Sequence, residues 1–410
     1  MRPRVLHLID SFESGGTERQ AIQLVRLLHE SGQCEVRLGC LQNKGLLRWQ
    51  ADRLGLGNIA EYPLTSFYDL NFARQVQRLR NYLTEQEINV IHSHCFYTNI
   101  FGMTSAALAQ TAARITCKGE TDFRTAPQKH AERFAFRLCH RVVANSEAVR
   151  ARLISDGIHA RKIVRHYNGL DMARVTVNGG ANRGQLLSEF GLSATPARKF
   201  VTIVANLQHP VKDYPMFLRA AARVRKEVAE AAFIIAGEGD LMPQMRAMAT
   251  GLEIQNDVFF IGRCDRIAEL LFISDVCALS SKAEGFSNSI LEYMAAARPV
   301  VATDVGGARE AIIPGEAGYI VPAGDDEQMA RRLIELLRNP EGARAMGEQG
   351  KRRVLDQFST SRQLSNTLGL YSELLGKKSV DPNSKPIEQH APGMPNSSAS
   401  PILESKSVEA

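Results

Sequence analysis

The feature of this sequence that most restricts its fold is a regular alternation of short β-rich segments with amphipathic helical segments. The first such pair is a β-rich run at 4–9, followed by a segment, 17–31, in which Ala21, Leu24 and Leu28 recur at helical spacing. The alternation continues to residue 172 and, after one interruption, starts again near residue 199. Strands joined by helices form parallel sheets with helices on both faces, so the sequence predicts an α/β protein.

The interruption divides the chain into two doubly wound units. Strands are expected at 4–9, 34–41, 89–93, 113–117, 141–144 and 162–166, and then at 200–205, 232–236, 258–261, 276–279 and 299–302. A chain of 410 residues is long enough for two domains, which we place at 1–172 and 199–360, with a linker region at 173–198. A last helix is expected at 361–376, and a disordered tail at 377–410, where five prolines and seven serines occur.

The composition excludes a transmembrane protein, a secreted disulfide scaffold and a fibrous protein. The chain is 44% hydrophobic and 23% charged, and its apolar runs are far shorter than the ~18 residues of a membrane span. A charge at Asp10 interrupts the N-terminal apolar stretch, so no signal peptide is expected. The seven cysteines are scattered and form no Cys-x-x-Cys motif, which is typical of reduced thiols in a cytoplasmic protein.

The charge is distributed unequally along the chain. Residues 1–172 carry 23 Lys and Arg against 16 Asp and Glu, whereas the rest of the chain is nearly balanced. A basic half is compatible with nucleic acid, an anionic membrane surface, an anionic substrate or simply a solvated face. Nucleic acid is the weakest of these interpretations, because aromatic residues do not interleave with the basic ones.

Loops at the carboxyl ends of the strands are where parallel sheets bind ligands. After the first strand, Gly15 and Gly16 open a helix and leave backbone N–H groups accessible to an anion, although such a pair is also a common turn. In the second domain Gly285 permits a tight turn, and the N–H groups of Phe286, Ser287 and Asn288 then begin a helix, where phosphate is favoured.

Two carboxylates and one lysine accompany the second loop. Glu284 precedes the helix and Glu292 lies two turns along it, and carboxylates bind sugar hydroxyl groups well. Lys212 follows the first strand of the second domain, where it could neutralise a departing diphosphate. These residues suit a nucleotide sugar; the alternative is a capped helix with a surface glutamate and a solvated lysine.

Taken in order, these motifs resemble glycosyltransferase family 4, which has the GT-B fold, over about residues 3–376. The segments that carry the resemblance are Gly15-Gly16-Thr17-Glu18, His92-Ser93-His94, Asn145-Ser146-Glu147, Asn168-Gly169-Leu170-Asp171, Lys212, Gly237-Glu238-Gly239, Phe260-Ile261-Gly262-Arg263, Glu284-x7-Glu292, Gly306-Gly307 and Gly318-Tyr319-Ile320-Val321-Pro322. The resemblance implies two Rossmann-like domains that face each other across a cleft, with the C-terminal helix returning to the first domain.

The resemblance also implies roles for individual residues. Glu292 would hold the ribose hydroxyl groups, and Glu284 with the backbone of Gly285, Phe286 and Ser287 would hold the donor sugar. Lys212 would contact the diphosphate, with Ser289 or Asn288 near it. Gly262 and Arg263 would take the base through main-chain groups, and Gly16 would approach the donor from the first domain. Transfer would retain the anomeric configuration, and neither a cofactor nor a metal ion is expected, since the chain has no Asp-x-Asp motif.

The sequence departs from the family at two places. Asn206 and Gln208 stand in a loop where many relatives have an arginine, so Asn206 is the candidate for that donor contact. Lys118 or Glu120 stands where many relatives have a histidine, and His94 is then the substitute catalytic candidate. Lys118, Arg124 or Arg263 could supply the missing positive charge, and Lys118, Glu120 and Arg124 are candidates for the acceptor side.

The expected function is therefore a metal-independent hexosyltransferase of polysaccharide or glycoconjugate biosynthesis. Its partners would be a nucleotide-sugar donor and a saccharide or lipid-linked acceptor, at the cytoplasmic side of an anionic membrane. The alternatives are a nucleotide-sugar epimerase of the same fold and a non-catalytic nucleotide-sugar-binding module; a nucleic-acid partner is not expected.

Overall fold

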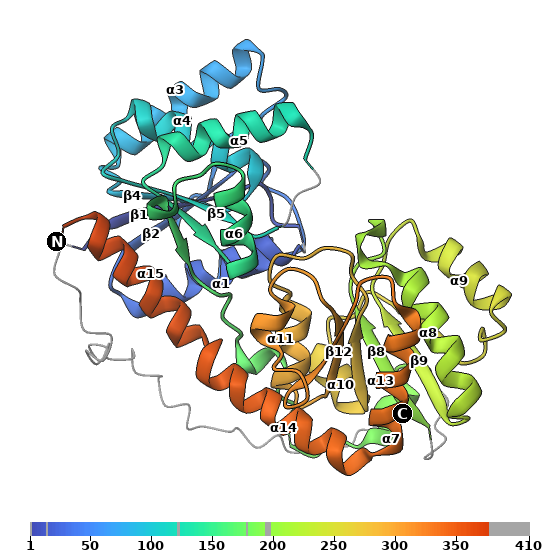
Figure 1. The fold of residues 1–410 in the computed structure, drawn as a ribbon. Coiled ribbons are helices and arrows are strands. Elements are labelled where there is room, and N and C mark those ends of the chain that lie inside the picture. Colours follow the sequence, from blue (N-terminus) through green and yellow to red (C-terminus); the bar gives the residue numbers. More distant parts are fainter. Residues whose placement is uncertain (1, 14, 121–123, 178, 193–197, 377–410) are drawn as a thin grey trace, which may run out of the picture.

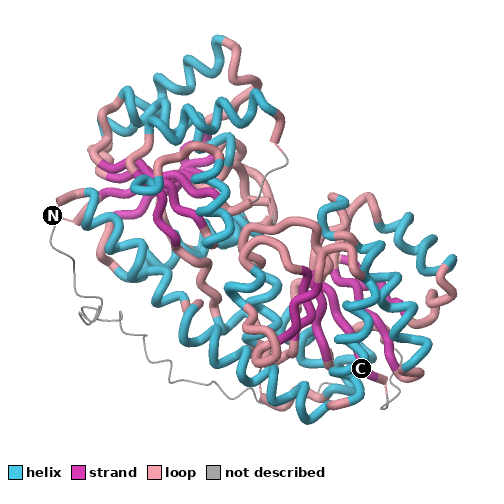
Figure 2. Tube along the Cα trace, in the orientation of Figure 1, coloured by secondary structure: helices cyan, strands magenta, loops and turns pink. Residues whose placement is uncertain are grey.

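The computed structural model describes residues 2–13, 15–120, 124–177, 179–192 and 198–376, and the predicted tail lies outside these ranges. The chain forms two α/β domains that lie next to each other (Figure 1). In each domain the strands form a central sheet with helices on both faces (Figure 2). The predicted two-domain, doubly wound fold is confirmed.

The first domain contains a parallel sheet of seven strands in the order β3-β2-β1-β4-β5-β6-β7. Its strands are β1 (Arg4–Ile9), β2 (Glu35–Cys40), β3 (Ala60–Glu61), β4 (Val90–Ser93), β5 (Ala113–Lys118), β6 (Arg141–Ala144) and β7 (Ile163–Arg165). Its helices are α1 (Gly16–Ser31), α2 (Arg48–Arg53), α3 (Leu70–Glu85), α4 (Phe96–Leu108), α5 (Ala126–Leu138) and α6 (Glu147–Ser155).

Alternate residues of each strand supply the two apolar layers of this domain. Leu6 and Leu8 of β1 pack beneath α3, α4 and α5, whereas Val5 and Ile9 pack on the other face beneath α1. This division follows from the two-residue repeat of a strand. It also places His7, between Leu6 and Leu8, on the α1 face.

The second domain contains a parallel sheet of six strands in the order β10-β9-β8-β11-β12-β13. Its strands are β8 (Lys199–Val204), β9 (Ala231–Ala236), β10 (Val258–Gly262), β11 (Val276–Leu279), β12 (Val300–Thr303) and β13 (Gly318–Val321). Its helices are α7 (Arg183–Glu189), α8 (Tyr214–Glu227), α9 (Met242–Gly251), α10 (Ile267–Ile273), α11 (Asn288–Ala295), α12 (Ala308–Ala311) and α13 (Asp326–Arg338).

Two C-terminal helices connect the domains. The helix α14 (Pro340–Gln357) packs against the second domain, and α15 (Thr360–Leu374) crosses to the first, as Figure 1 shows. Leu370 and Tyr371 of α15 are buried in the first-domain core beside α1. The expected return of the C-terminal helix is therefore confirmed, and the packing of Tyr371 brings a residue of this last helix beneath the cleft.

The predicted linker region contains structure of its own. Its helix α7 places Leu186 and Leu187 against Phe200 of β8 and Leu270 of α10, so this part of the segment packs on the second domain. The apolar face of this helix is short and is flanked by small residues typical of loops, so the sequence predicts only a loop here. Within the described ranges, no helix combines the length and the apolar character that crossing a bilayer requires.

Candidate active site between the two domains

The carboxyl ends of both sheets meet at a cavity of about 250 Å³. Residues from both domains line it, among them Gly16, His94, Lys118, Lys212, Glu284, Gly285, Phe286 and Asn288. The structure thus brings eight of the sequence-predicted site residues to one place, although they are as much as 272 positions apart in the chain. Such a cavity at the carboxyl ends of parallel strands is where ligands of doubly wound folds bind.

Glu284 and Lys212 form an ion pair in this cavity. The Nζ atom of Lys212 lies 2.6 Å from Oε1 of Glu284, and the hydroxyl group of Ser281 donates to the same oxygen at 2.7 Å. Lys212 ends a 3-10 turn, Pro210–Lys212, and its backbone carbonyl accepts a hydrogen bond from the Ser280 hydroxyl group at 2.8 Å. The two charges neutralise each other, so an incoming diphosphate would compete with Glu284 for the lysine.

Glycines hold the loop that carries Glu284. Gly306 has φ of +52°, and a Cβ atom there would lie 2.2 Å from the carbonyl oxygen of Glu284. The N–H group of Gly307 donates to the carbonyl oxygen of Gly285 at 2.7 Å. A Cβ atom on Gly285 would in turn lie 1.9 Å from the carbonyl oxygen of Gly119 in the first domain. The close approach of three backbones explains why glycine occupies these positions.

Glu292 lies in a second, adjoining cavity of about 490 Å³, which shares Gln20 and Asn288 with the first. Its side chain is buried on α11 and forms an ion pair with Arg174. Arg19 and Asp265 also line this cavity, and burial, with the neighbouring Arg174, lowers the pKa of Arg19. The two glutamates of the predicted motif therefore face two adjoining cavities rather than one.

Asn288 lines both cavities, whereas its neighbour Ser289 lines neither, and both side chains have structural contacts. Asn288 bridges the domains, since its Nδ2 donates to the carbonyl oxygen of Gly16 at 3.2 Å and its Oδ1 accepts from Asn168 at 2.8 Å and Gln20 at 3.2 Å. The hydroxyl group of Ser289 donates to the carbonyl oxygen of Val204 at 2.9 Å. Asn288, the first residue of α11, thus links the two domains by hydrogen bonds.

Of the other second-domain candidates, Phe286 lines the first cavity, whereas the structure places Asn206, Gly262, Arg263 and Ser287 outside the lining of both cavities. Gly262 ends β10 with φ of +69°, and its carbonyl oxygen accepts from the N–H group of Gly237 at 2.8 Å. The side chain of Arg263 pairs with Asp265 at 3.0 Å, at the side of the second cavity. Phe286 packs on Tyr167 and Phe358, and Ser287 is the N-cap residue of α11. Asn206 is exposed in the loop after β8.

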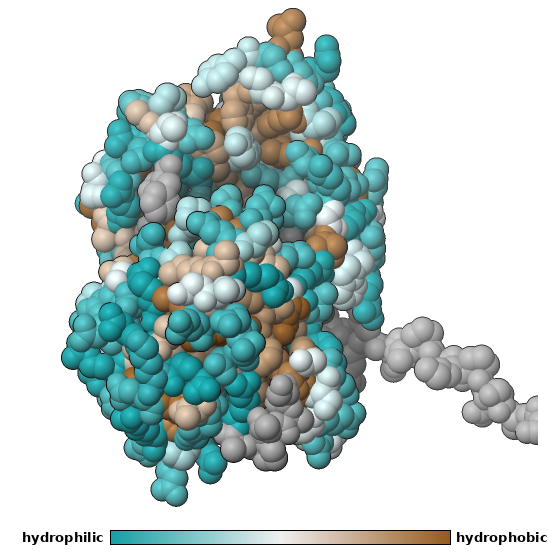
Figure 3. Space-filling model, turned by 90° about the vertical axis from the view of Figure 1, so that its right-hand side faces the viewer, coloured by the Kyte–Doolittle hydropathy of each residue, from teal (hydrophilic) through white to brown (hydrophobic). Residues whose placement is uncertain are grey.

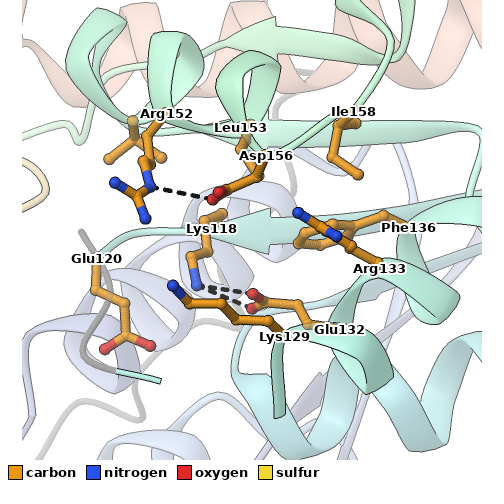
Figure 4. A pocket seen from close by; sticks show the side chains of 11 residues that line it. Lys118, Glu120, Lys129, Glu132, Arg133, Phe136, Arg152, Leu153, Asp156 and Ile158 are labelled. Atoms are coloured by element: carbon orange, nitrogen blue, oxygen red, sulfur yellow. Dashed lines mark hydrogen bonds and ion pairs between the residues drawn. The ribbon is translucent and has the colours of Figure 1, made fainter. Parts of the chain in front are cut away.

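The basic candidates of the first domain are engaged by carboxylates. Lys118 is buried, and its Nζ lies 2.9 and 3.0 Å from the two carboxylate oxygens of Glu132, as Figure 4 shows. Arg124 stacks on Phe96 with its Cζ 4.0 Å from the ring centroid, and it pairs with Glu120 and Glu132. Because Glu132 already compensates Lys118, this lysine is a weak candidate for the missing positive charge.

Two acidic residues for which the sequence predicts no role in the site lie beside His94. Asp10 and Glu18 line a third cavity of about 230 Å³ with His94, Lys118 and Arg124. Burial raises the pKa of Asp10 to about 6, against the hydrogen bond that Thr98 donates to it at 3.0 Å, and burial also raises that of Glu18. Asp10 directly follows β1 and Glu18 lies in the first turn of α1, so the glycine pair Gly15 and Gly16 between them was the available signal.

His94 itself belongs to a buried group of three histidines. Its Nε2 lies 2.8 Å from Nδ1 of His7, and its ring stacks on that of His92 with the centroids 4.6 Å apart. Burial lowers the pKa of His94 to about 3. The sequence identifies His92 and His94 but misses His7, whose pairing with His92 in the sheet depends on strand order.

Two family models match the chain, one over each domain. The family described as Glycosyltransferase Family 4 matches residues 14–174, and the family described as Glycosyl transferases group 1 matches residues 190–353.

Individual relatives agree with this assignment. The chain is 27% identical to EpsD of Bacillus subtilis (strain 168), provisionally named a glycosyltransferase, over 72% of this chain and 79% of that protein. It is 33% identical to the N-acetyl-alpha-D-glucosaminyl L-malate synthase of Bacillus anthracis, but over only 47% of this chain and 49% of the synthase. Among solved structures, HepE of Anabaena in complex with UDP has a TM-score of 0.78 and 19% identity, over 91% of this chain and 100% of that one. At this identity the structural likeness concerns the fold.

Proposed function

The chain belongs to glycosyltransferase family 4, and we propose that it transfers a sugar from a nucleoside diphosphate sugar to a saccharide or lipid-linked acceptor. The observation that carries the proposal is the Lys212–Glu284 ion pair, set at the N-terminal end of α11 and facing the first domain across the cavity. A cation and helix N–H groups suit a diphosphate, and a carboxylate beside them suits sugar hydroxyl groups.

We propose that the second cavity takes the nucleoside of the donor. Glu292 there would accept hydrogen bonds from ribose hydroxyl groups, which requires the Arg174 contact to rearrange. The HepE structures contain UDP and UDP-glucose, which supports a uridine nucleotide as the first donor to test.

The reaction we propose needs no metal ion. Lys212 lines the first cavity, Arg19 and Arg174 line the adjoining one, and α11 adds the positive end of its dipole. When the glycosidic bond breaks, these groups would stabilise the diphosphate that leaves. The acceptor hydroxyl group would enter from the first domain and attack the anomeric carbon on the same face from which the diphosphate departs, so the departing phosphate can take its proton. Such a course retains the anomeric configuration and needs no second carboxylate.

The acceptor would lie in the first domain. The cavity beside His94 offers the carboxylates of Asp10 and Glu18, which suit the hydroxyl groups of a saccharide. A lipid-linked saccharide would also bring the enzyme to the cytoplasmic face of a membrane.

The surface of the first domain supports such a contact. Tyr68 and Leu70, before and at the start of α3, are 90% and 85% exposed, and Phe134 on α5 is 50% exposed beside Arg133 and Arg137. Figure 3 shows apolar side chains at the upper end of the molecule, the end where Figure 1 places α3. Sedimentation with vesicles that contain anionic lipid should carry the protein down at low salt, less so at high salt, and less so for Leu70→Ser. Equal sedimentation of both proteins would contradict this contact.

The function is tested by release of nucleoside diphosphate from UDP-, GDP- and ADP-sugars in EDTA, with a lipid-linked saccharide extract as acceptor. We expect one nucleotide sugar to be consumed, with Lys212→Ala and Glu284→Gln at least ~100-fold slower. Lys226→Ala, at an exposed position on α8, is the matched control and should retain full activity. Formation of an epimer without an acceptor would support an epimerase instead, and binding without turnover would support a non-catalytic module.

A further inference from the structure

Five buried or half-buried side chains form one continuous hydrogen-bonded chain beneath the cavity. Nε2 of His92 lies 3.1 Å from Sγ of Cys117, and Nδ1 of His92 lies 2.8 Å from the hydroxyl oxygen of Tyr371. That oxygen lies 3.3 Å from Nε2 of His7, and Nδ1 of His7 lies 2.8 Å from Nε2 of His94. Both nitrogens of His7 and of His92 are thus used inside the protein.

We call these five hydrogen-bonded side chains, Cys117, His92, Tyr371, His7 and His94, the relay. They come from separate parts of the chain. His7 is on β1 and His92 is its partner on β4, while Cys117 is on β5 and Tyr371 comes from α15. The proposed function uses only His94 among these residues, so the other four need an explanation. His94 and Cys117, the two ends, both line the cavity at the cleft.

Each member of the relay carries one hydrogen at neutral pH. Burial lowers the pKa of the three histidines and raises that of Cys117 to about 12 and that of Tyr371 well above its usual value. A neutral imidazole has one donor and one acceptor nitrogen, so all the bonds run in one direction when the Tyr371 hydroxyl group donates to one histidine and accepts from the other. If they run from Cys117, then Nδ1 of His94 carries a hydrogen; if they run from His94, it presents a lone pair.

The far nitrogen of His94 is the one that remains for a ligand. Among the described residues, no hydrogen-bond partner contacts Nδ1 of His94, and His94 lines both the cleft cavity and the cavity beside Asp10. The direction of the relay therefore decides whether a sugar hydroxyl group meets a donor or an acceptor there.

We propose that Tyr371 and His7 are positioning residues that fix the tautomer of His94, so that its Nδ1 hydrogen-bonds a sugar hydroxyl group bound in the cleft. The proposal rests on the proposed function for the identity of the ligand. It also gives α15 a second role, because the helix that ties the two domains together supplies the central hydroxyl group of the relay.

A metal ion is the other occupant that three histidines suggest. Ligand atoms of His7, His92 and His94 lie within 4.8 Å of one another. Most of these nitrogens are already paired with each other, with Tyr371 or with Cys117 at hydrogen-bonding distance, which favours the relay. Titration with Co²⁺ decides between the two: a visible absorption band that His7→Gln abolishes would overturn the proposal.

The kinetic test is a double-mutant cycle. Tyr371→Phe keeps the ring and removes only the hydroxyl group, and we expect kcat to fall by about 10-fold with KM for the donor nearly unchanged. In a His94→Ala background the same substitution should have no further effect on kcat. Tyr62→Phe, at a buried position on the opposite face of the same sheet, is the control and should leave kcat unchanged. Additive losses from Tyr371→Phe and His94→Ala would overturn the proposal.

A second measurement does not depend on activity. In the ¹⁵N spectrum of the imidazole nitrogens, the wild-type protein should show a single neutral tautomer for His94, and Tyr371→Phe should show an average of both. Two tautomers of His94 in the wild-type protein would overturn the relay even if transfer is found. A single tautomer in a protein that consumes no nucleotide sugar would uphold the relay and refute the proposed function.

Discussion

Lys212 and Glu284 neutralise each other's charge in the protein without substrate. Removing both charges should therefore affect activity more than stability, which allows the two effects to be measured separately. Their side chains are only 20% and 14% exposed. Removing one partner leaves the other charge half-buried without compensation, whereas removing both leaves no charge. The effect of such a pair on stability cannot be predicted from the sequence, because each residue alone looks like an ordinary surface charge.

We predict that Lys212→Met and Glu284→Gln each lower the free energy of unfolding by about 1–3 kcal/mol. The double variant should lie closer to the wild-type protein than the sum of the single changes, while all three variants lose activity. Urea denaturation of the four proteins measures this. Strict additivity of the two losses would show that the ion pair does not exist in solution.

Asp10 is a residue at which burial opposes stability at neutral pH. The folded protein holds the pKa of this carboxyl at about 6, above its value of 3.8 in the unfolded chain. The folded state therefore binds the proton more tightly, and this contribution to stability is fully present below about pH 3.8 and lost as pH rises through about 6.

We predict that Asp10→Asn raises the free energy of unfolding at pH 7 by about 1–3 kcal/mol, because the amide carries no charge to desolvate. At pH 4 the variant and the wild-type protein should differ little. Chemical denaturation at both pH values measures the difference. A loss of stability at pH 7 would show that the bond from Thr98 outweighs the burial of the charge.

At the scale of elements, the loop of Glu284 depends on the turn at Gly306. Alanine at position 306 would have to adopt a positive φ and would also collide with the carbonyl oxygen of Glu284. Gly315 has φ of +85°, and a Cβ atom there would have no other atom within 4 Å, so Gly315→Ala carries the strain without the collision.

We predict that Gly315→Ala costs about 1 kcal/mol and leaves activity unchanged, whereas Gly306→Ala costs more and reduces kcat/KM at least ~10-fold. Thermal unfolding and turnover of the two variants test the comparison. Equal activity in both would show that the position of Glu284 does not depend on this turn.

The elements differ in how well the sequence predicts them. The strands β1, β4, β9 and β11 are fully or nearly fully buried and read as short apolar runs, so their positions follow from the sequence. The two-residue strand β3 and the helix α7 have too few residues for a periodic pattern.

The site divides in the same way. Lys212, Glu284 and Glu292 are recognisable from a motif, and the structure places them in two adjoining cavities. The partners of these residues, such as Arg174 for Glu292 and Glu132 for Lys118, come from distant positions. Only the tertiary structure reveals them, and the same holds for His7 and Tyr371 in the relay.

At the scale of the whole molecule, buried histidines concentrate in the first domain. Burial lowers the pKa of His7 and His92 well below 6.5, that of His94 to about 3 and that of His166 to about 4. The unfolded chain binds these protons below about pH 6.5 and the folded protein does not. Stability therefore falls as pH decreases below about 6.5, towards the folded pKa values.

We predict that acid unfolds the first domain near pH 5, since each of the four histidines costs about 1.4 kcal/mol per pH unit below its unfolded pKa. Asp10 offsets part of this loss. The fluorescence of Trp49, the one tryptophan of the chain, reports on this domain. A first domain that stays folded at pH 4 would show that these histidines are not buried in solution.

Hydrogen bonds join the two domains directly, at the cleft and beside it. Asn288 joins α11 to α1, and the carboxylate of Glu310 accepts from the N–H groups of Glu147 and Ala148 at the start of α6, at 2.7 and 3.0 Å. These hydrogen bonds keep the cleft narrow in this structure. A donor bound to the second domain would therefore also contact the first domain.

Binding of nucleoside diphosphates tests the central claim most directly. Calorimetric titration with UDP, GDP and ADP in EDTA should show one nucleotide binding, and at 100 times Kd it should stabilise the protein by about 2.7 kcal/mol. Glu292→Ala should weaken that binding at least ~10-fold, whereas Glu316→Ala, at an exposed position of the same domain, should leave it unchanged. Absence of binding by all three nucleotides, or equal binding by Glu292→Ala and the wild-type protein, would contradict the account.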